Sequence, residues 1–279
     1  GSTNLPTAGP REEKALPRGE HALQLYSLAT PNGVKVTALL EELCLRYGVE
    51  YDAYLIDISK GDQFTSGFVA ANPNSKIPAL LHYEDVKEAE PTRVFESASI
   101  MLYLCEKFDR DNAFLPPPGH PLRAECLSWV FWTQGSAPYL GGGYGHFYSY
   151  APIKVKYAID RYTMETKRQL DVLDRHLGGL SGGDCAGGPY LCGKEFTIAD
   201  LVCWPWYGAL ALGRLYNGSK EFLDMEKYQH VLAWVKRIDE REGVRRGRMV
   251  NRSWGEPHEQ LKERHSSKDF EEMDKLKPN

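Results

Sequence analysis

The chain has 279 residues, 42% of them hydrophobic, which is enough apolar material for two cores of ordinary domain size. Its formal net charge is −4, from 34 Lys and Arg against 38 Asp and Glu, and this balance argues against broad electrostatic binding to nucleic acid. No stretch has the length and apolarity of a membrane span, so neither nucleic acid nor a membrane is expected as a partner.

The six cysteines are scattered along the chain. None belongs to a Cys-x-x-Cys motif, and no spacing of Cys and His resembles a zinc site, so no metal is expected. Cysteines distributed in this way are typical of a reducing compartment, which predicts a cytoplasmic protein.

Residues 1–20 are polar and rich in proline and charge, which predicts an irregular arm rather than a packed element. An apolar strand then ends at Leu28, and apolar residues recur at helical spacing over 34–45. Thr30 or Asn32 can cap this helix. The turn therefore presents a hydroxyl, an amide and backbone N–H groups at a positive helix end, which stabilises an anion such as a thiolate. The alternative is an ordinary capped helix.

The next segments predict a small mixed sheet. A strand at 51–58 lies beyond a helix, which favours a parallel β-α-β crossover. Residues 63–71 predict a short helix or turn, the 72–81 segment leads from a turn into a third strand, 93–95 is a short fourth strand, and a helix opens at 96–97. The order β-α-β-α-β-β-α is that of a thioredoxin-like domain, which we assign to 21–110.

The Pro116-Pro117-Pro118-Gly119 run is the clearest boundary in the sequence, and we assign a linker to 111–121. An all-helical domain is expected over 122–248, with helical patterns at 122–139, 153–177, 198–215 and 228–240. A capping box at Thr197–Asp200 makes Asp200 a fold residue. The polar extension 249–279 lacks a sustained apolar period and is expected to pack on a partner.

These features together resemble the soluble glutathione transferases. The motifs that carry the resemblance are Asn72-Pro73-x-x-Lys76-Ile77-Pro78, Phe95-Glu96-Ser97 and Thr197-Ile198-Ala199-Asp200. The resemblance is narrower to the nu-class, YghU-like disulfide-bond reductases, which are related to fungal nitrogen-regulator proteins. Its motifs are Thr30-Pro31-Asn32-Gly33, the Gly- and aromatic-rich segment 139–148, Asn251-Arg252, Glu259-Gln260-Leu261 and Glu263-Arg264-His265. It implies a thioredoxin-like domain followed by an all-α helical bundle, the glutathione transferase fold.

Glutathione has two carboxylates, an ammonium and a thiol, and needs complementary groups at fixed distances. Glu96 can accept the γ-glutamyl ammonium, while the Ser97 hydroxyl and helix-start N–H groups hold the adjacent carboxylate. Lys76 and Gln63 are candidates for the glycyl carboxylate. The Ile77-Pro78 pair, whose peptide bond is cis by resemblance, offers backbone groups to the middle of the ligand. The alternatives are a favourable helix start at Glu96 and Ser97 and a solvated surface lysine at Lys76.

The thiol would lie at the turn before the first helix. In the nu class the matching hydroxyl and Asn positions contact the sulfur, and the resemblance implies this role for Thr30 and Asn32. Tyr26 lies inside the strand by alternation and is interpreted as a packing residue. Ser27 is a weaker candidate.

Without Cys-x-x-Cys, a thioredoxin-like fold cannot run dithiol chemistry on its own sulfurs. The nu-class resemblance implies two glutathione molecules per site instead. For the second, Arg161 matches a ligand-binding arginine by resemblance, and the segment 141–150 offers His146 and Tyr150 as donors. Arginine suits a carboxylate through its two-pronged geometry. The alternatives are an ion pair for Arg161 and a structural histidine for His146.

The resulting hypothesis is a glutathione-dependent disulfide-bond reductase that binds reduced or oxidised glutathione as cosubstrate. The alternatives are conjugation of glutathione to electrophiles, peroxide reduction, or a non-enzymatic glutathione-binding regulator. By resemblance the protein is a homodimer that acts on small-molecule disulfides or electrophiles.

Overall fold

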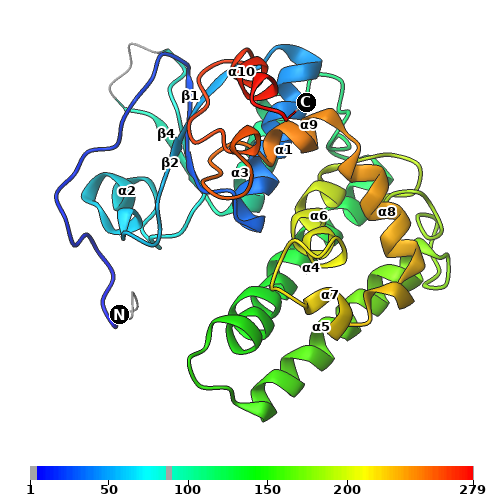
Figure 1. Cartoon of the computed structure of the whole chain (residues 1–279). Helices are drawn as coiled ribbons and strands as arrows, with labels where there is room; N and C mark the ends of the chain where they lie inside the picture. The colour runs from blue at the N-terminus through cyan, green and yellow to red at the C-terminus, as the bar shows by residue number, and fades with distance from the viewer. Residues whose placement is uncertain (1–4, 86–89, 279) are drawn as a thin grey trace. The chain divides into compact units, whose positions relative to one another are not determined.

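The computed structural model describes residues 5–85 and 90–278 and divides the chain into two compact units (Figure 1). The first unit runs up to Phe108 and includes the segment from Glu242 onward, and the second spans Asp109–Arg241. The sequence placed 242–248 at the end of the helical domain, whereas here these residues belong to the first unit.

The first unit is built on a four-stranded mixed sheet. Its strands are β1 (Leu23–Ser27), β2 (Tyr51–Leu55), β3 (Ala79–His82) and β4 (Thr92–Phe95), in the order β2-β1-β3-β4. Strands β1 and β2 are parallel, and β3 is antiparallel to both of its neighbours. The central strand β1 is buried along its whole length, as expected of a strand paired on both sides and covered by other elements.

Helices connect these strands in the predicted order β-α-β-α-β-β-α, so the expected thioredoxin-like topology is confirmed. They are α1 (Pro31–Tyr47), α2 (Ser66–Ala71) with the short 3₁₀ helix η1 (Asp62–Phe64) before it, and α3 (Ser97–Phe108). Helix α1 begins with Pro31 at its first position, where the missing N–H costs nothing, and ends at Gly48, which adopts the left-handed conformation that terminates a helix.

Residues 5–20 are irregular, as predicted, but the part at 11–16 is also packed on the first unit, which was not expected. The backbone N–H of Arg11 donates to Phe64 O at 2.7 Å, and Ser66 N donates to Glu12 O at 2.8 Å. Gly67 lies so close to the arm that a Cβ there would sit 2.7 Å from Leu16 N. Residues 11–16 are therefore held against η1 and α2 by backbone contacts. No apolar pattern in the sequence predicts these contacts.

The C-terminal segment also folds onto the first unit. It contains α9 (Glu242–Gly247), the 3₁₀ helix η4 (Pro257–Glu259) and α10 (Asp269–Lys275), drawn in orange and red near α1 in Figure 1. A Cβ at Gly247 would lie 2.4 Å from the Ala38 backbone, and Thr37 Oγ1 donates to Gly247 O at 2.7 Å. Glycine therefore lets α9 touch the α1 backbone, and this contact explains why residues 242–248 leave the helical domain.

Arg264 ties the tail to the same helix. Its side chain is fully buried, its Nε lies 3.1 Å from Glu41 Oε1, and its Nη1 donates to Tyr51 O at 2.7 Å. The Arg264 backbone also pairs with Ala53 of β2 as an isolated antiparallel bridge. The tail was expected to pack on a partner, and the structure instead packs Arg264 into the unit's own sheet and helix.

The regular secondary-structure elements of the second unit are all helices. Its elements are α4 (Pro121–Pro138), the π-helical η2 (Tyr139–Tyr150), α5 (Lys156–Leu177), α6 (Ile198–Ala211), α7 (Ser219–Phe222), the 3₁₀ helix η3 (Met225–Lys227) and α8 (Gln229–Asp239). The capping box is formed as predicted, with Thr197 N donating to Asp200 Oδ2 at 3.0 Å. Asp200 Oδ1 also accepts from Leu191 N and Trp234 Nε1, so this buried carboxylate joins three segments. None of the described helices is both long and apolar enough to cross a membrane.

Candidate functional site

The turn between β1 and α1 has the geometry of a helix N-terminus. Thr30 is the N-cap residue, and its side chain accepts a hydrogen bond from Gly33 N at 3.4 Å. Thr30 and Asn32 are both half-buried, so their polar groups can reach a ligand. A Cβ at Gly33 would lie 1.9 Å from Leu28 O, so glycine is needed for so tight a strand-to-helix turn.

The two other candidates for the sulfur are less accessible. Tyr26 is 1% exposed, and its hydroxyl donates to Pro17 O at 2.7 Å. Burial raises the Tyr26 pKa well above its usual value, so this phenol is a poor source of a nearby proton. Ser27 is fully buried. Thr30 and Asn32, which are half-buried, are therefore the more accessible polar side chains of this turn.

Sequence reasoning missed a buried lysine one turn into α1. Lys35 is 1% exposed, and its Nζ donates to Ser97 Oγ at 3.3 Å. A buried ammonium is costly unless it is hydrogen-bonded or paired, so its position between α1 and the start of α3 needs a reason. The signal was available, because Lys35 shares a helix face with Leu39 and Leu43, which are fully buried.

Glu96 and Ser97 form the start of α3. Glu96 has φ 71°, a left-handed conformation that is uncommon for a residue other than glycine, and its carbonyl accepts from Ile100 N at 2.9 Å. Its side chain is exposed, whereas Ser97 is 5% exposed. Strained backbone of this kind is found preferentially at ligand sites, and here it accompanies a carboxylate that faces solvent.

The loop before β3 is braced by a side chain that the motif analysis did not assign a role. Asn72 is 1% exposed, its Nδ2 donates to Lys76 O at 2.6 Å, and its Oδ1 accepts from Asn74 N at 2.9 Å. The Ile77–Pro78 peptide bond is cis, as expected. Lys76 projects into solvent from this braced loop, so its ammonium is available to an anion.

Gln63, in η1, is 7% exposed, and its Nε2 donates to Ile58 O at 3.2 Å. Its buried Oε1 has no hydrogen-bond partner among the residues that the structure describes. A carboxylate needs donors, so Gln63 suits the glycyl carboxylate only through the second hydrogen of Nε2, while Oε1 suits an N–H group of a ligand.

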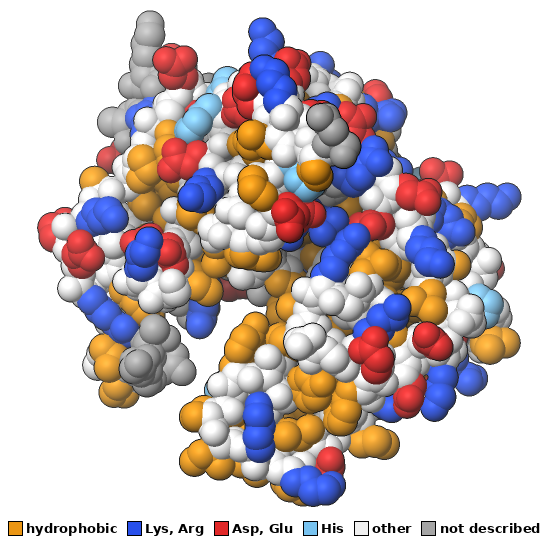
Figure 2. Space-filling view, in the orientation of Figure 1, with side chains coloured by type: hydrophobic (Ala, Val, Ile, Leu, Met, Phe, Trp, Pro, Cys, Tyr) orange, Lys and Arg blue, Asp and Glu red, His pale blue; other side chains and the backbone are white. Residues whose placement is uncertain are grey.

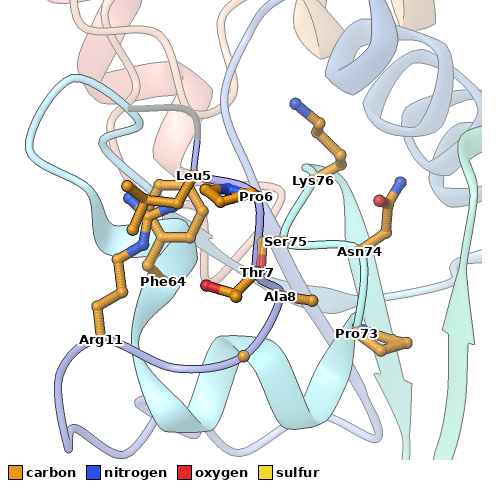
Figure 3. Close-up of a pocket in the computed structure, with 11 residues that line it drawn as sticks. Leu5, Pro6, Thr7, Ala8, Arg11, Phe64, Pro73, Asn74, Ser75 and Lys76 are labelled. Atoms are coloured by element: carbon orange, nitrogen blue, oxygen red, sulfur yellow. The ribbon is translucent and has the colours of Figure 1, made fainter. Parts of the chain in front are cut away.

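A pocket of about 210 Å³ lies beside Lys76. Figure 3 shows the arm passing between Phe64 with Arg11 on one side and the loop 73–76 on the other. The Arg11 guanidinium lies 3.5 Å from the centroid of the Phe64 ring. The arm thus forms one wall of a polar pocket next to a candidate binding residue.

The residues suggested for a second glutathione lie in the second unit. Arg161 on α5 and both His146 and Tyr150 in η2 are exposed. The two elements pack closely, since a Cβ at Gly143 would lie 2.4 Å from the Tyr162 ring. Within 5–85 and 90–278, no hydrogen bond or ring contact joins the three candidate side chains to one another, so the structure brings together their elements but not their functional groups.

The same region carries exposed apolar side chains. Figure 2 shows orange side chains gathered on the lower part of this unit, over the green segments of Figure 1. The large exposed hydrophobic residues of α4, η2, α5 and the loop between η2 and α5 include Phe131, Tyr139, Tyr150, Ile153, Tyr157 and Met164. A patch of this kind is typical of an interaction surface.

Two family models match the chain. The glutathione S-transferase N-terminal domain matches residues 31–107, and the glutathione S-transferase C-terminal domain matches residues 156–237. The chain belongs to the glutathione S-transferase family. This assignment fits the four-stranded mixed sheet with its cis Ile77–Pro78 bond and the helical second unit.

Three relatives of this transferase are informative. The disulfide-bond oxidoreductase YghU of Escherichia coli is 54% identical over 96% of this chain and 88% of its own. A crystal structure of the glutathione transferase YghU from Streptococcus pneumoniae, complexed with glutathione, has 54% identity and a TM-score of 0.79, over 88% of this chain and 89% of that one. A transferase-family structure from Pseudomonas fluorescens with two glutathione molecules bound has 32% identity and a TM-score of 0.71, over 83% and 94% of the chains.

Proposed function

We propose that this transferase is a glutathione-dependent disulfide-bond oxidoreductase of the nu class. The observation that carries the proposal is the turn at Thr30 and Asn32, where a hydroxyl, an amide and a helix N-terminus surround a position suited to a thiolate. The 54% identity to a disulfide-bond oxidoreductase that extends over nearly the whole chain supports the same chemistry.

The first glutathione would bind along the first unit. Glu96 would accept from the γ-glutamyl ammonium, and Ser97 with the α3 N-terminus would hold the adjacent carboxylate. The Ile77-Pro78 backbone would pair with the cysteinyl residue, and Lys76 with Gln63 would hold the glycyl end. These groups all lie in one compact unit, and the solved relative from Streptococcus pneumoniae contains glutathione.

The chemistry is two successive thiol–disulfide exchanges. The first glutathione thiolate attacks one sulfur of the substrate disulfide, the S–S bond breaks, and the departing thiolate takes a proton. A second glutathione thiolate then attacks the sulfur of the bound glutathione in the mixed disulfide, which releases the second substrate thiol. Two glutathione molecules are oxidised to one glutathione disulfide, and the substrate disulfide is reduced to two thiols. The enzyme supplies no sulfur of its own.

The second glutathione would use donors from the second unit, with Arg161 for a carboxylate and His146 and Tyr150 as hydrogen-bonding groups. The relative from Pseudomonas fluorescens with two bound glutathione molecules supports this stoichiometry. In a reductase, a second tripeptide gives the resolving thiol that a Cys-x-x-Cys motif provides in thioredoxins.

We further propose a cytoplasmic homodimer. The exposed apolar side chains at Phe131, Tyr157 and Met164 are 62%, 79% and 67% exposed, which is costly for a surface that stays in water. A second copy that covers them would form a two-fold interface of the usual kind. Sedimentation should give twice the 31.5 kDa mass of the chain. The reducing cytoplasm suits both the six free cysteines and the supply of reduced glutathione.

Conjugation of glutathione to electrophiles, peroxide reduction and a regulatory role are less favoured. The Tyr26 hydroxyl, the nearest phenol along the chain, is engaged by Pro17 and removed from solvent, so a tyrosine-assisted conjugation site is not supplied at this turn.

The test is steady-state reduction of a small symmetrical disulfide by glutathione, with both products measured. We expect one glutathione disulfide for every two substrate thiols released, and a much slower reaction with an aromatic electrophile. Conjugation faster than disulfide reduction would contradict the proposal, as would the absence of glutathione binding in calorimetry.

A further inference from the structure

Asn251 connects the C-terminal segment to the turn that precedes α1. It lies between α9 and η4 and is fully buried. Its carbonyl accepts a hydrogen bond from Ala29 N at 3.0 Å, and Ala29 is the residue immediately before Thr30. The Asn251-Arg252 motif has no role in the proposed function, yet this contact brings it to the turn that would hold the glutathione sulfur.

The peptide group between Leu28 and Ala29 is held at both ends. Its N–H donates to Asn251 O, and its carbonyl, Leu28 O, accepts from Thr30 N at 2.7 Å. Leu28 O also lies against α1, since a Cβ at Gly33 would be only 1.9 Å from it. A planar peptide group that is bonded through both its N–H and its C=O has little freedom to rotate. Because Thr30 follows this group, the orientation of the group determines where the Thr30 hydroxyl points.

The backbone of Asn251 has the conformation that this contact requires. Its φ is 55°, in the left-handed region where asparagine is found more often than most other residues with a side chain. Asn251 N donates to Leu261 O at 2.7 Å, and Asn251 Nδ2 donates to Lys262 O at 2.8 Å. Both of its donors therefore bind the segment 261–262, and its carbonyl is left for Ala29.

Stability alone does not explain an asparagine at this position. Asn251 Oδ1 is buried and has no hydrogen-bond partner among the residues that the structure describes, and a buried acceptor without a partner is costly. Glycine would adopt the same φ without this unpaired atom. What asparagine adds over glycine is the Nδ2 donor to Lys262 O, which restricts the backbone to one conformation.

We propose that Asn251 is a positioning residue for the thiolate site. Its carbonyl orients the Leu28–Ala29 peptide group and, through that group, the Thr30 hydroxyl and the N–H groups at the start of α1. The inference rests on the proposed function and adds to it a residue from outside the thioredoxin-like core. Asn251 does not touch the sulfur and acts on the reaction only through Thr30.

The test is titration of the bound glutathione thiol, followed by the ultraviolet absorbance of its thiolate. Asn251→Ala disfavours the left-handed conformation and removes the Nδ2 donor, so the contact with Ala29 should be lost. The apparent pKa of the bound thiol should rise by about 0.5, because the hydrogen bond from Thr30 is weakened rather than removed. Glutathione affinity at a pH where the thiol is protonated should be unchanged, since it depends on groups elsewhere in the site.

Asn251→Gly separates positioning from stability. Both variants lose the hydrogen bond to Lys262 O, but glycine adopts the left-handed conformation without strain. Asn251→Gly should therefore lose stability and yet keep most of the thiol pKa of the unaltered protein. An equal rise of the thiol pKa in both variants would overturn the inference, because the pKa would then follow stability rather than the orientation of the carbonyl.

Glu259→Gln is the matched control. It removes the ion pair between Arg252 and Glu259, whose atoms lie 2.9 Å apart, in the same tail segment but away from Ala29. The thiol pKa should be unchanged, and a rise as large as that in Asn251→Ala would overturn the inference. If Thr30→Ala raises the thiol pKa and Asn251→Ala does not, the tail has no part in the site while the proposed function stands. If the unaltered protein does not bind glutathione, the proposed function itself fails and the inference with it.

Hydrogen exchange of the unaltered protein tests the contact without any substitution. The Ala29 amide hydrogen should be protected as strongly as those of Asn251 and Leu261, because the three amides belong to one hydrogen-bonded unit. An Ala29 amide that exchanges much faster than the other two would overturn the inference, since the tail would not then hold the turn.

Discussion

Lys35 Nζ donates a hydrogen bond to Ser97 Oγ at 3.3 Å, and this contact joins the first helix to the start of α3 inside the first unit. An ammonium has only donors, so Ser97 Oγ accepts from Lys35 and must donate its own hydrogen elsewhere. Because Ser97 Oγ accepts from Lys35, the Ser97 hydroxyl hydrogen is directed elsewhere and can donate to a ligand. A bound carboxylate requires such a donor. The buried positive charge of Lys35 also lies near the N-termini of α1 and α3, where anions are already favoured.

Lys35→Met should separate binding from stability. Methionine fills similar volume but removes the buried charge and its hydrogen bond to Ser97, so the midpoint of thermal unfolding should fall by less than the loss of glutathione affinity would suggest. Affinity for glutathione should fall about tenfold, since one charge-assisted interaction is lost. Calorimetry with a glutathione analogue that lacks the γ-glutamyl carboxylate is the control, and that analogue should bind both proteins equally. Loss of stability with unchanged glutathione affinity would assign Lys35 a purely structural role.

Thr30→Ala should act on the reaction through the glutathione sulfur. A hydroxyl that donates to a thiolate lowers the pKa of the thiol, so its removal should raise the apparent thiol pKa in the pH–rate profile of disulfide reduction. The rate near neutral pH should fall about tenfold, the size of one hydrogen bond to a charged group. Thr30 also caps α1, so about 1 kcal/mol of stability should be lost as well.

Thr30→Ser is the matched control, because serine keeps both the cap and the hydroxyl. It should restore the profile of the unaltered protein. An unchanged apparent pKa and rate in Thr30→Ala would mean that Thr30 is a helix cap and that the sulfur is held elsewhere. For Asn32, an alanine variant that keeps most of the activity would point to the backbone N–H as the contributing donor.

The sequence predicted the sheet topology and the capping box well because each depends on neighbours in the chain. The apolar run before Thr30 and the helical spacing after it specify β1 and α1, and Thr197 with Asp200 specifies the start of α6. Such local patterns are sufficient to specify a segment's structure when no alternative structure of the same segment fits them.

Three of the features that the sequence did not predict concern contacts between distant segments. Gly247 does not have a positive φ, so its backbone conformation does not require glycine. Glycine is needed there because the backbone of Ala38 lies too close for a Cβ. In the sequence, Arg264 looks like any other charged residue of a polar tail, although its side chain is fully buried against Glu41. The arm is held by backbone hydrogen bonds, which leave no side-chain period. Polar residues that are buried by pairing carry no apolar signal, so an analysis of hydropathy assigns them to the surface.

The buried pair of Arg264 and Glu41 gives a stability test. Burial raises the pKa of the Glu41 carboxyl despite the neighbouring guanidinium, and Tyr51 also donates to Glu41 Oε1 at 2.6 Å. Arg264→Met should lower the free energy of unfolding by about 3–5 kcal/mol, because it leaves a buried carboxylate without its cation. Chemical denaturation measures this change.

The double variant Glu41→Gln/Arg264→Met should recover much of that loss, since the uncompensated charge is then gone. Lys275→Met serves as a control, because its pair with Glu272 is exposed to solvent and should contribute little. A tail that is detached in solution would contradict the prediction by making Arg264→Met as mild as the control.

The last prediction concerns pH and the contact between the tail and β2. His265 Nδ1 lies 2.7 Å from Asp52 Oδ1, and its Nε2 lies 3.5 Å from Glu263 Oε2. Partial burial opposes protonation of this ring, but the hydrogen bonds to Asp52 and Glu263 prevail and raise the pKa of His265 above its usual value. His21 Nε2 lies 2.8 Å from the His265 carbonyl oxygen, so the segment that follows the arm joins the same contact.

A histidine whose pKa is higher in the folded state stabilises the fold fully below its unfolded-state pKa of about 6.5, and this contribution is lost as the pH rises through the folded value. The free energy of unfolding should therefore decline between about pH 6 and pH 8, by no more than about 1 kcal/mol, because the His265 side chain is 44% exposed and the pair is screened. His265→Gln should remove this decline, whereas His230→Gln, a change at an exposed histidine of the second unit, should keep it. Denaturant unfolding at pH 6, 7 and 8 measures the slope, and an equal slope in His265→Gln and the unaltered protein would exclude the Asp52 contact as its cause.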